Sequence, residues 1–305
     1  MTPSSSYIPA PAADFVLPFD IAPLGVRGRL VRLSGVSAEA LTAHKLPEPA
    51  ARVAAETLTL SALLGSSLKL DGRLSVQTKS DGPLDLIACD YYGAEGERPA
   101  GLRGYARVDE ARAADLGKAP GFADLAGKGS LGILIEPRVG GQTYQGIVEL
   151  SPEGIAASAQ TYFAQSEQLP TSIRLAAAPV FEPGKPVAWR AGGILLQRTA
   201  EAAKHDDDWE RLKMFIATIE DFELVDTALK AEDLLWRLFH EDEIRVLPFE
   251  RLQFRCDCSA DRIVGVLRSY KEDERKNLAD ADGMIRARCE FCGKTHEVLP
   301  DTLQK

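Results

Sequence analysis

Alternating apolar and polar positions predict a run of β-strands in the first two hundred residues of this chain. In 72–79, Leu74 and Val76 alternate with Arg73 and Ser75, which is the pattern of a strand that buries one face. The same reading predicts strands at 28–33, 84–89, 101–108, 131–136 and 143–150. Because these strands follow one another without long helices between them, we expect a mainly antiparallel sheet.

Two segments of this region have helical spacing instead. One runs from about 48 to 64. The other follows Ser151-Pro152, a pair that suits the N-cap and first turn of a helix, and its apolar positions are Ile155, Ala159, Tyr162 and Phe163. A mainly antiparallel sheet with flanking helices makes the expected fold class α+β.

Apolar residues also recur at helical spacing in 201–250, a segment that we call the linker. Its first stripe consists of Trp209, Leu212, Phe215, Ile216, Ile219 and Phe222, and its second of Leu234, Leu235, Trp236 and Leu238. Each stripe needs another surface to cover it. The candidates for contact with that surface are Trp209, Leu212, Ile216, Ile219, Leu235 and Leu238.

Charge changes this picture of the linker. The chain has a formal net charge of −9, and the linker alone holds 6 Lys and Arg against 15 Asp and Glu. Periodicity by itself favours two permanently packed helices, whereas repulsion between so many carboxylates favours an element whose docking is marginal. In the second case, docking should be stabilised by amide replacements at Asp206, Asp207, Asp208, Glu241, Asp242 and Glu243.

Length and composition indicate several domains. With 305 residues and 45% apolar content, we expect a disordered N-terminus at 1–13, an α+β core at 14–200, the helical linker at 201–250 and a small domain at 251–305. No apolar run approaches the ~18 residues of a membrane span, and the N-terminus lacks the pattern of a signal peptide. We therefore expect a cytoplasmic protein without a membrane partner.

Four of the five cysteines lie in 251–305, as Cys256-Asp257-Cys258 and Cys289-Glu290-Phe291-Cys292. Four thiolates complete the tetrahedral coordination of Zn²⁺, which predicts a structural site for one zinc ion. In an extended C-x-C segment the Cα atoms lie about 6.6 Å apart, at the limit for a disulfide, and strained disulfides are easily reduced. The spacing therefore predicts a zinc site that is also a reversible redox switch.

The residues around the cysteines predict a small unit that depends on its metal. Ser259 suits the N-cap of a helix, 284–288 is predicted to be a strand, and Gly293 allows a turn before a returning strand at 295–299. Large apolar side chains are few here. Metal binding would therefore supply the folding free energy of this unit.

Three further signals carry less weight. Residues 127–132 match G-x-G-x-x-G, but they lead into a predicted strand, which is the wrong context for a dinucleotide site. His296 is a candidate fifth ligand, although four thiolates already complete the zinc site. Cys89 lies in an apolar strand and is expected to be an inert buried thiol.

Two other functions would use the same four cysteines. A zinc ribbon that binds nucleic acid needs a basic stripe, which the acidic linker and the nearly neutral 251–305 do not offer. A thiol-disulfide oxidoreductase needs its C-x-x-C at a helix N-terminus, whereas 289–292 is predicted on a hairpin. We expect neither a nucleic-acid partner nor an enzyme, and keep both functions as alternatives.

The segments Phe-Arg-Cys-Asp-Cys-Ser at 254–259 and Cys-Glu-Phe-Cys-Gly at 289–293 resemble the redox-regulated bacterial heat-shock chaperones of 33 kilodaltons. The resemblance covers nearly the whole chain and includes the blocks at 80–84, 102–108, 192–197 and 235–241. It implies a reduced, zinc-bound, inactive monomer. It further implies that oxidation forms the disulfides Cys256–Cys258 and Cys289–Cys292 and releases zinc. The zinc domain and linker then unfold, and a homodimer holds unfolding client proteins without ATP.

Overall fold

The computed structural model describes residues 14–68, 70–117, 119–199 and 206–299. The expected disordered N-terminus, 1–13, lies outside these ranges. Contacts between Cα atoms divide the chain into two compact units, one ending at Phe254 and one beginning at Arg255. We expected the last domain boundary after 250, whereas strand β11, Glu250–Phe254, pairs within the larger unit.

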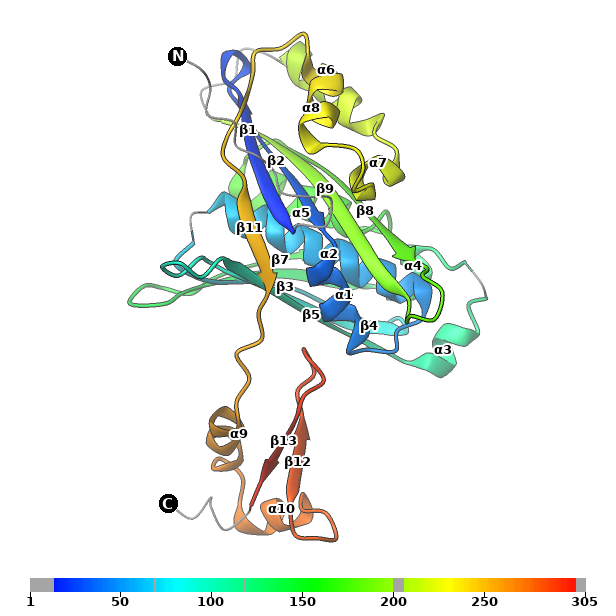
Figure 1. The fold of residues 1–305 in the computed structure, drawn as a ribbon, viewed down its shortest axis with the longest axis vertical. Helices are drawn as coiled ribbons and strands as arrows, with labels where there is room; N and C mark the ends of the chain where they lie inside the picture. Colours follow the sequence, from blue (N-terminus) through cyan, green and yellow to red (C-terminus); the bar gives the residue numbers. More distant parts are fainter. Residues whose placement is uncertain (1–13, 69, 118, 200–205, 300–305) are drawn as a thin grey trace. The chain divides into compact units, whose positions relative to one another are not determined.

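A curled, mainly antiparallel sheet dominates the larger unit (Figure 1). Its spatial order is β7-β6-β3-β4-β5-β11-β1-β2-β9-β8, with β10 paired to β1, and among the described strand pairs only β5 and β11 are parallel. Besides β11, its strands are β1 (Phe15–Ile21), β2 (Val26–Leu33), β3 (Gly72–Ser80), β4 (Leu84–Tyr92), β5 (Ala100–Val108), β6 (Gly129–Pro137), β7 (Tyr144–Glu149), β8 (Thr171–Val180), β9 (Ala188–Arg198) and β10 (Ile244–Val246). The predicted α+β fold with a mainly antiparallel sheet is confirmed.

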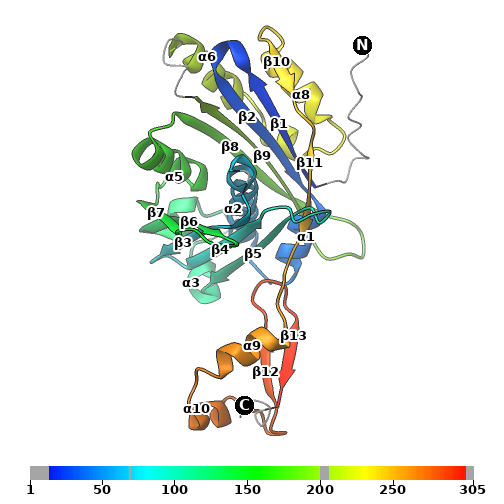
Figure 2. The same cartoon turned by 90° about the vertical axis from the view of Figure 1, so that its left-hand side faces the viewer.

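Helix α2, Glu48–Ser67, lies between the two halves of the sheet (Figure 2). It is buried almost all round because its residues are small or apolar, as at Ala54 and Leu58. The hydroxyls of Thr57, Thr59 and Ser61 donate to carbonyls one turn earlier, so these polar groups cost little when buried. The shorter elements of this region are η1 (Ala22–Leu24), α1 (Gly35–Thr42), α3 (Glu110–Ala114), α4 (Phe122–Ala126), α5 (Ile155–Tyr162) and η2 (Phe163–Glu167).

The predicted start of α5 is wrong. The helix begins at Ile155 with Gly154 as its N-cap, not with Ser151. Ser151 belongs to a turn instead, because its carbonyl accepts the Gly154 N–H and its hydroxyl accepts the Glu153 N–H. Gly154 has φ 124°, a conformation that favours glycine and separates the turn from the helix.

The described part of the linker, 206–250, contains three helices on the sheet face that points away from α2 (Figure 2). They are α6 (Asp206–Ala217), α7 (Asp221–Val225) and α8 (Ala231–Phe239). The first predicted stripe is therefore broken between α6 and α7. Phe222 and Trp236, which we placed on the apolar stripes, are each 64% exposed, so their predicted burial is wrong.

The smaller unit is a hairpin with two short helices. It contains α9 (Ala260–Leu267), α10 (Glu272–Asn277), β12 (Ile285–Arg288) and β13 (Thr295–Val298). The predicted cap is confirmed, because the Ser259 hydroxyl accepts the Arg262 N–H. Among its described residues, the apolar core has three buried members, Leu267, Ile285 and Val298. Such a core is too small to hold the unit together alone.

Across the part of the chain that the structure describes, every helix is too short or too polar to cross a membrane.

Candidate functional site

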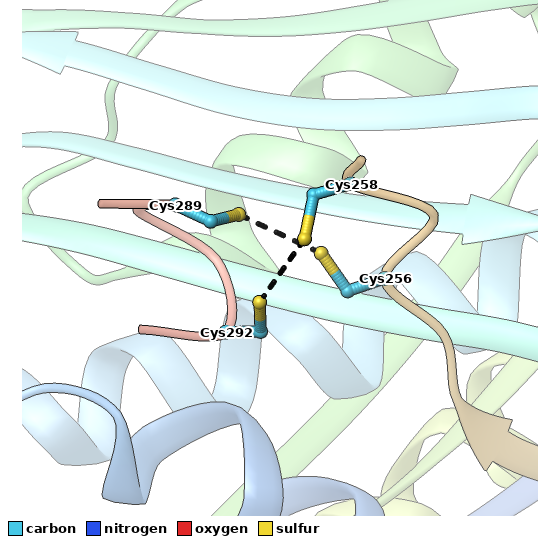
Figure 3. Close-up of side chains that lie close together, drawn as sticks. All are labelled: Cys256, Cys258, Cys289 and Cys292. Carbon is cyan, nitrogen blue, oxygen red and sulfur yellow. Dashed lines mark hydrogen bonds between the residues drawn. The ribbon is translucent and has the colours of Figure 1, made fainter. Parts of the chain in front are cut away.

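The four C-terminal cysteines meet in the smaller unit (Figure 3). Cys256 and Cys258 lie in the segment that leads to α9, and Cys289 and Cys292 lie in the turn between β12 and β13. This turn is closed by two backbone hydrogen bonds of 2.8 Å, from Cys289 N to Lys294 O and from Gly293 N to Cys289 O. Gly293 has φ 71°, which a residue with a side chain rarely adopts.

The spacing of the sulfur atoms fits one tetrahedral metal ion. All four Sγ atoms lie within 4.8 Å of one another. The Cys256 and Cys289 sulfurs are 3.7 Å apart, and those of Cys258 and Cys292 are 3.4 Å apart. A zinc ion with Zn–S bonds of about 2.3 Å separates its sulfurs by about 3.8 Å, whereas a disulfide needs about 2.05 Å. The residues therefore fit a four-thiolate metal centre.

The electrostatics of this cluster favour a bound cation. Burial, followed by the neighbouring thiols, raises the pKa of Cys258. Burial also raises the pKa of Cys256. Burial opposes ionisation of Cys289 as well, but the backbone N–H groups of Cys292 and Phe291 hold its pKa below the usual value. A soft divalent cation would offset half of the charge of the four thiolates and leave a net charge of −2, whereas without it these four side chains could not all stay ionised at such short separations.

His296 lies beside the cysteines but outside their cluster. It is 7% exposed, and its Nε2 atom is 3.3 Å from the sulfur of Cys258. The group of atoms that could share one ion contains the four sulfurs and not this nitrogen. Cys89 is a separate, fully buried thiol in β4 of the larger unit.

All six candidate docking residues of the linker are buried: Trp209, Leu212, Ile216, Ile219, Leu235 and Leu238. They form one apolar cluster with residues from four strands of the sheet, namely Phe15, Leu17, Phe19, Ile21, Val26, Leu30, Ala176, Ile194 and Leu196. The linker thus covers an apolar face that would otherwise be open to solvent.

Arg32 is a buried arginine of β2 that contacts the linker and that no sequence pattern predicted. Its guanidinium donates to the carbonyl of Glu223, at 3.0 Å, and to that of Leu229. Burial lowers its pKa. Glu223 is buried too, and it pairs with Arg237 of α8. The available signal was an arginine among the apolar positions of 28–33, but its target carbonyls are almost two hundred residues away in sequence.

The linker acids do not simply repel one another. Asp206 pairs with Arg198 of β9 at 2.8 Å, and Asp221 pairs with Arg174 of β8 at 2.8 Å. Asp242 accepts two hydrogen bonds from Arg211. The specific partners of Asp206, Asp208 and Asp242 argue against the expectation that amide replacements stabilise docking at these three positions.

Comparisons with known proteins agree on one family. A family model described as Hsp33 protein matches residues 14–298. The 33 kDa chaperonin of Caulobacter vibrioides is 39% identical over 293 residues, which cover 94% of this chain and 95% of the relative. That of Salmonella typhimurium is 36% identical over 271 residues, with 88% and 86% covered. The crystal structure of the Thermotoga maritima 33 kDa chaperonin has the same fold, with a TM-score of 0.75 at 20% identity, covering 96% of this chain and 97% of that one.

Proposed function

This chain belongs to the Hsp33 family of chaperones, which are not enzymes, and on that premise we propose that it is a redox-regulated, ATP-independent holdase. In the reduced, inactive state it binds one Zn²⁺ through Cys256, Cys258, Cys289 and Cys292. The observation that carries the proposal is the convergence of two cysteine pairs at tetrahedral spacing in a unit with almost no apolar core. When bound, the metal supplies folding free energy to this unit and keeps the four sulfurs ionised.

The same thiolates make the site sensitive to oxidants. A thiolate is the form of cysteine that reacts with peroxide, so a site that must keep four of them is the most oxidisable part of the chain. We propose that oxidation forms the disulfides Cys256–Cys258 and Cys289–Cys292. Sulfurs joined in a disulfide can no longer bind the metal as thiolates, so zinc is released and the smaller unit, which begins at Arg255, unfolds.

The linker is the second part of the proposed switch. In the reduced state, the linker helices α6, α7 and α8 would cover the apolar face of β1, β2, β8 and β9, as they do in the structure. We propose that the linker undocks after zinc release at temperatures that also unfold other proteins. Undocking exposes the apolar residues of the sheet and of α6 and α8, a surface that suits unfolded client proteins.

We propose that the protein is a monomer when reduced and a homodimer when oxidised, and that the homodimer is the active form. We further propose that it is cytoplasmic and has no nucleic-acid or membrane partner. A released linker exposes apolar surface that a second copy can cover, which supports dimerisation on oxidation. The acidic linker also argues against binding to phosphate backbones.

One assay tests the proposal directly. Reduced and peroxide-treated protein are compared for suppression of the aggregation of a heat-unfolded client, with zinc measured in both samples. We expect one zinc per reduced chain, no zinc after oxidation, and suppression only by the oxidised sample. The control is Cys256→Ser combined with Cys289→Ser, which removes one sulfur from each pair; it should bind no zinc in either sample, and peroxide should not change its suppression of aggregation. Zinc retained after all four thiols are oxidised would refute the switch.

Two further readouts address the other functions considered. Salt-dependent retention on nucleic acid would favour a zinc ribbon that binds nucleic acid. Catalytic turnover in insulin reduction would favour an oxidoreductase. We expect neither with reduced or oxidised protein.

A further inference from the structure

We propose that His296 is a positioning residue of the metal centre, which donates an Nε2–H hydrogen bond to the Cys258 thiolate and slows the attack of that sulfur on peroxide. This inference rests on the proposed zinc site and concerns how readily the site is oxidised. Its basis is the 3.3 Å separation between His296 Nε2 and Cys258 Sγ.

The strand that carries His296 explains how the ring reaches the sulfur. In β13, His296 and Val298 are buried while Thr295 and Glu297 are exposed, so the inward face holds one polar and one apolar residue. Val298 joins the small apolar core with Leu267 and Ile285. His296 lies two residues closer to the cysteine turn, paired with Ala287 of β12. An apolar side chain would satisfy burial at this position, but only a side chain with a donor can give the sulfur a hydrogen bond.

The geometry distinguishes this role from metal ligation. The nitrogen of His296 contacts one sulfur, whereas each ligand atom of the cluster lies within 4.8 Å of all the others. Four thiolates already fill the coordination of a tetrahedral ion. His296 is therefore placed outside the ligand set, where a hydrogen bond to a ligand fixes its orientation and reduces the charge on it.

The hydrogen bond acts on the first step of oxidation. The Cys258 thiolate attacks one oxygen of hydrogen peroxide, so an S–O bond forms, the O–O bond breaks and hydroxide leaves. The Cys256 thiolate then attacks the resulting sulfenic acid, an S–S bond forms, and a second hydroxide leaves. Two electrons have passed from the two sulfurs to peroxide, and water or buffer supplies the protons for both hydroxides. An N–H donor on Cys258 withdraws the electron density that the first step needs.

Three variants separate the hydrogen bond from packing. His296→Gln places an amide nitrogen near the position of Nε2, whereas His296→Asn has the same donor on a shorter side chain that cannot reach it. His296→Phe keeps the ring and removes the donor. Zinc release under excess hydrogen peroxide is followed with a chromogenic chelator. We expect release to be roughly tenfold faster in the Phe and Asn variants than in the wild type, with Gln close to the wild type.

The inference would be overturned if zinc release from His296→Phe and His296→Asn were as slow as from the wild type. It would also be overturned if His296→Gln released zinc as fast as His296→Asn. Zinc K-edge X-ray absorption of the reduced protein supplies a readout that does not depend on oxidation. We expect four sulfur neighbours in the wild type and in all three variants. A nitrogen neighbour that disappears in His296→Phe would show that His296 is a ligand, against the inference.

These outcomes also separate the inference from the proposed function. A wild-type protein that holds zinc and does not lose it to peroxide refutes the redox switch, and the role of His296 in oxidation falls with it. A wild type that loses zinc to peroxide at the same rate as His296→Phe refutes the role of His296 alone.

Discussion

Burial distinguishes Cys89 from the four clustered cysteines, which are only partly buried. Cys89 is 0% exposed, and burial raises its pKa above the usual value. Its sulfur lies 3.9 Å from the Ala54 carbonyl of α2, inside the main apolar core. A thiol that cannot ionise reacts slowly with peroxide. The expectation of a buried thiol at this position is confirmed.

Replacing Cys89 should leave the redox response intact. We expect Cys89→Ser to bind one zinc per reduced chain and to release it to peroxide at the wild-type rate, because this thiol belongs to another unit of the chain. Zinc titration and thiol counting would check this. A variant that no longer responds to peroxide would show that Cys89 takes part in the switch.

Glu56 of α2 makes the stability of the larger unit depend on pH. Burial raises its pKa from the usual 4.5 to about 7, and the repulsion of Asp221 in α7 adds to that effect against the attraction of Arg52 and Arg174. In the unfolded chain the carboxyl ionises near 4.5. Between pH 4.5 and about 7, the folded protein keeps the Glu56 proton that the unfolded chain has lost. This group therefore stabilises the folded state less as the pH rises through that range.

We therefore expect Glu56→Gln to raise the melting temperature by a few °C at pH 8 and by less at pH 5. The physical reason is that the amide removes the cost of a buried charge, which the wild type carries only when Glu56 is ionised. Differential scanning fluorimetry of both proteins across this range measures the effect. An equal increase at both pH values would contradict the role of ionisation.

At the scale of elements, the linker is held by polar contacts at defined points as well as by apolar burial. Arg32 donates to the carbonyl of Glu223, within α7, and to that of Leu229, which lies shortly before α8. The backbone of β9 also approaches α7 closely, because a Cβ at Gly192 would lie 2.3 Å from the Leu224 carbonyl oxygen. These contacts position α7 on the sheet.

Removing the guanidinium should loosen the linker without affecting the metal site. We expect Arg32→Met to leave two carbonyls without their donor and to cost about 2–4 kcal/mol of docking free energy. Hydrogen exchange across 221–239 should accelerate, and zinc content should stay at one per chain. The matched control is Arg27→Met, on the same strand at an exposed position. Unchanged exchange in the Arg32 variant would show that apolar burial alone holds the linker.

Simple charge repulsion predicts that neutralising a linker carboxylate stabilises docking, whereas the ion pairs of the linker predict the opposite for a paired carboxylate. We expect Asp242→Asn to increase exchange in α6 by an amount corresponding to about 1 kcal/mol, because the Arg211 pairing loses its charge-assisted hydrogen bonds. Asp207→Asn, at an exposed position of the first helical turn, serves as the comparison. Slower exchange in the Asp242 variant would restore the view that repulsion governs docking.

At the scale of the whole molecule, the two compact units depend on different sources of stability. The larger unit has two extensive apolar clusters, one around α2 and one between the sheet and the linker helices. The described part of the smaller unit has one cluster of three buried apolar residues. The linker helices pack entirely within the larger unit. Loss of the metal should therefore act first on the smaller unit.

We expect a strong zinc chelator, added under reducing conditions at 25 °C, to unfold 255–299 and to leave the larger unit folded. All three tryptophans, Trp189, Trp209 and Trp236, lie in the larger unit, so their fluorescence should not change. Hydrogen exchange in 285–298 should become fast in the same sample. A shift in tryptophan emission without heating would show that the metal also stabilises linker docking.

The local pattern of the chain was enough to predict the α+β class, most strands of the sheet's first half, helix α2 and the cysteine hairpin. Period-2 alternation in β3 and the paired C-x-C and C-x-x-C motifs are local signals, because neighbouring residues alone determine them. Only the tertiary structure decided which elements and side chains contact one another. Strand β9 was missed because Gly192 and Gly193 interrupt its apolar pattern, yet both permit close contact with α7 and β8. The buried Arg32, the pairing of Asp242 and the contact of His296 with Cys258 depend on residues brought together by folding from distant parts of the sequence, and no local pattern encodes such distances.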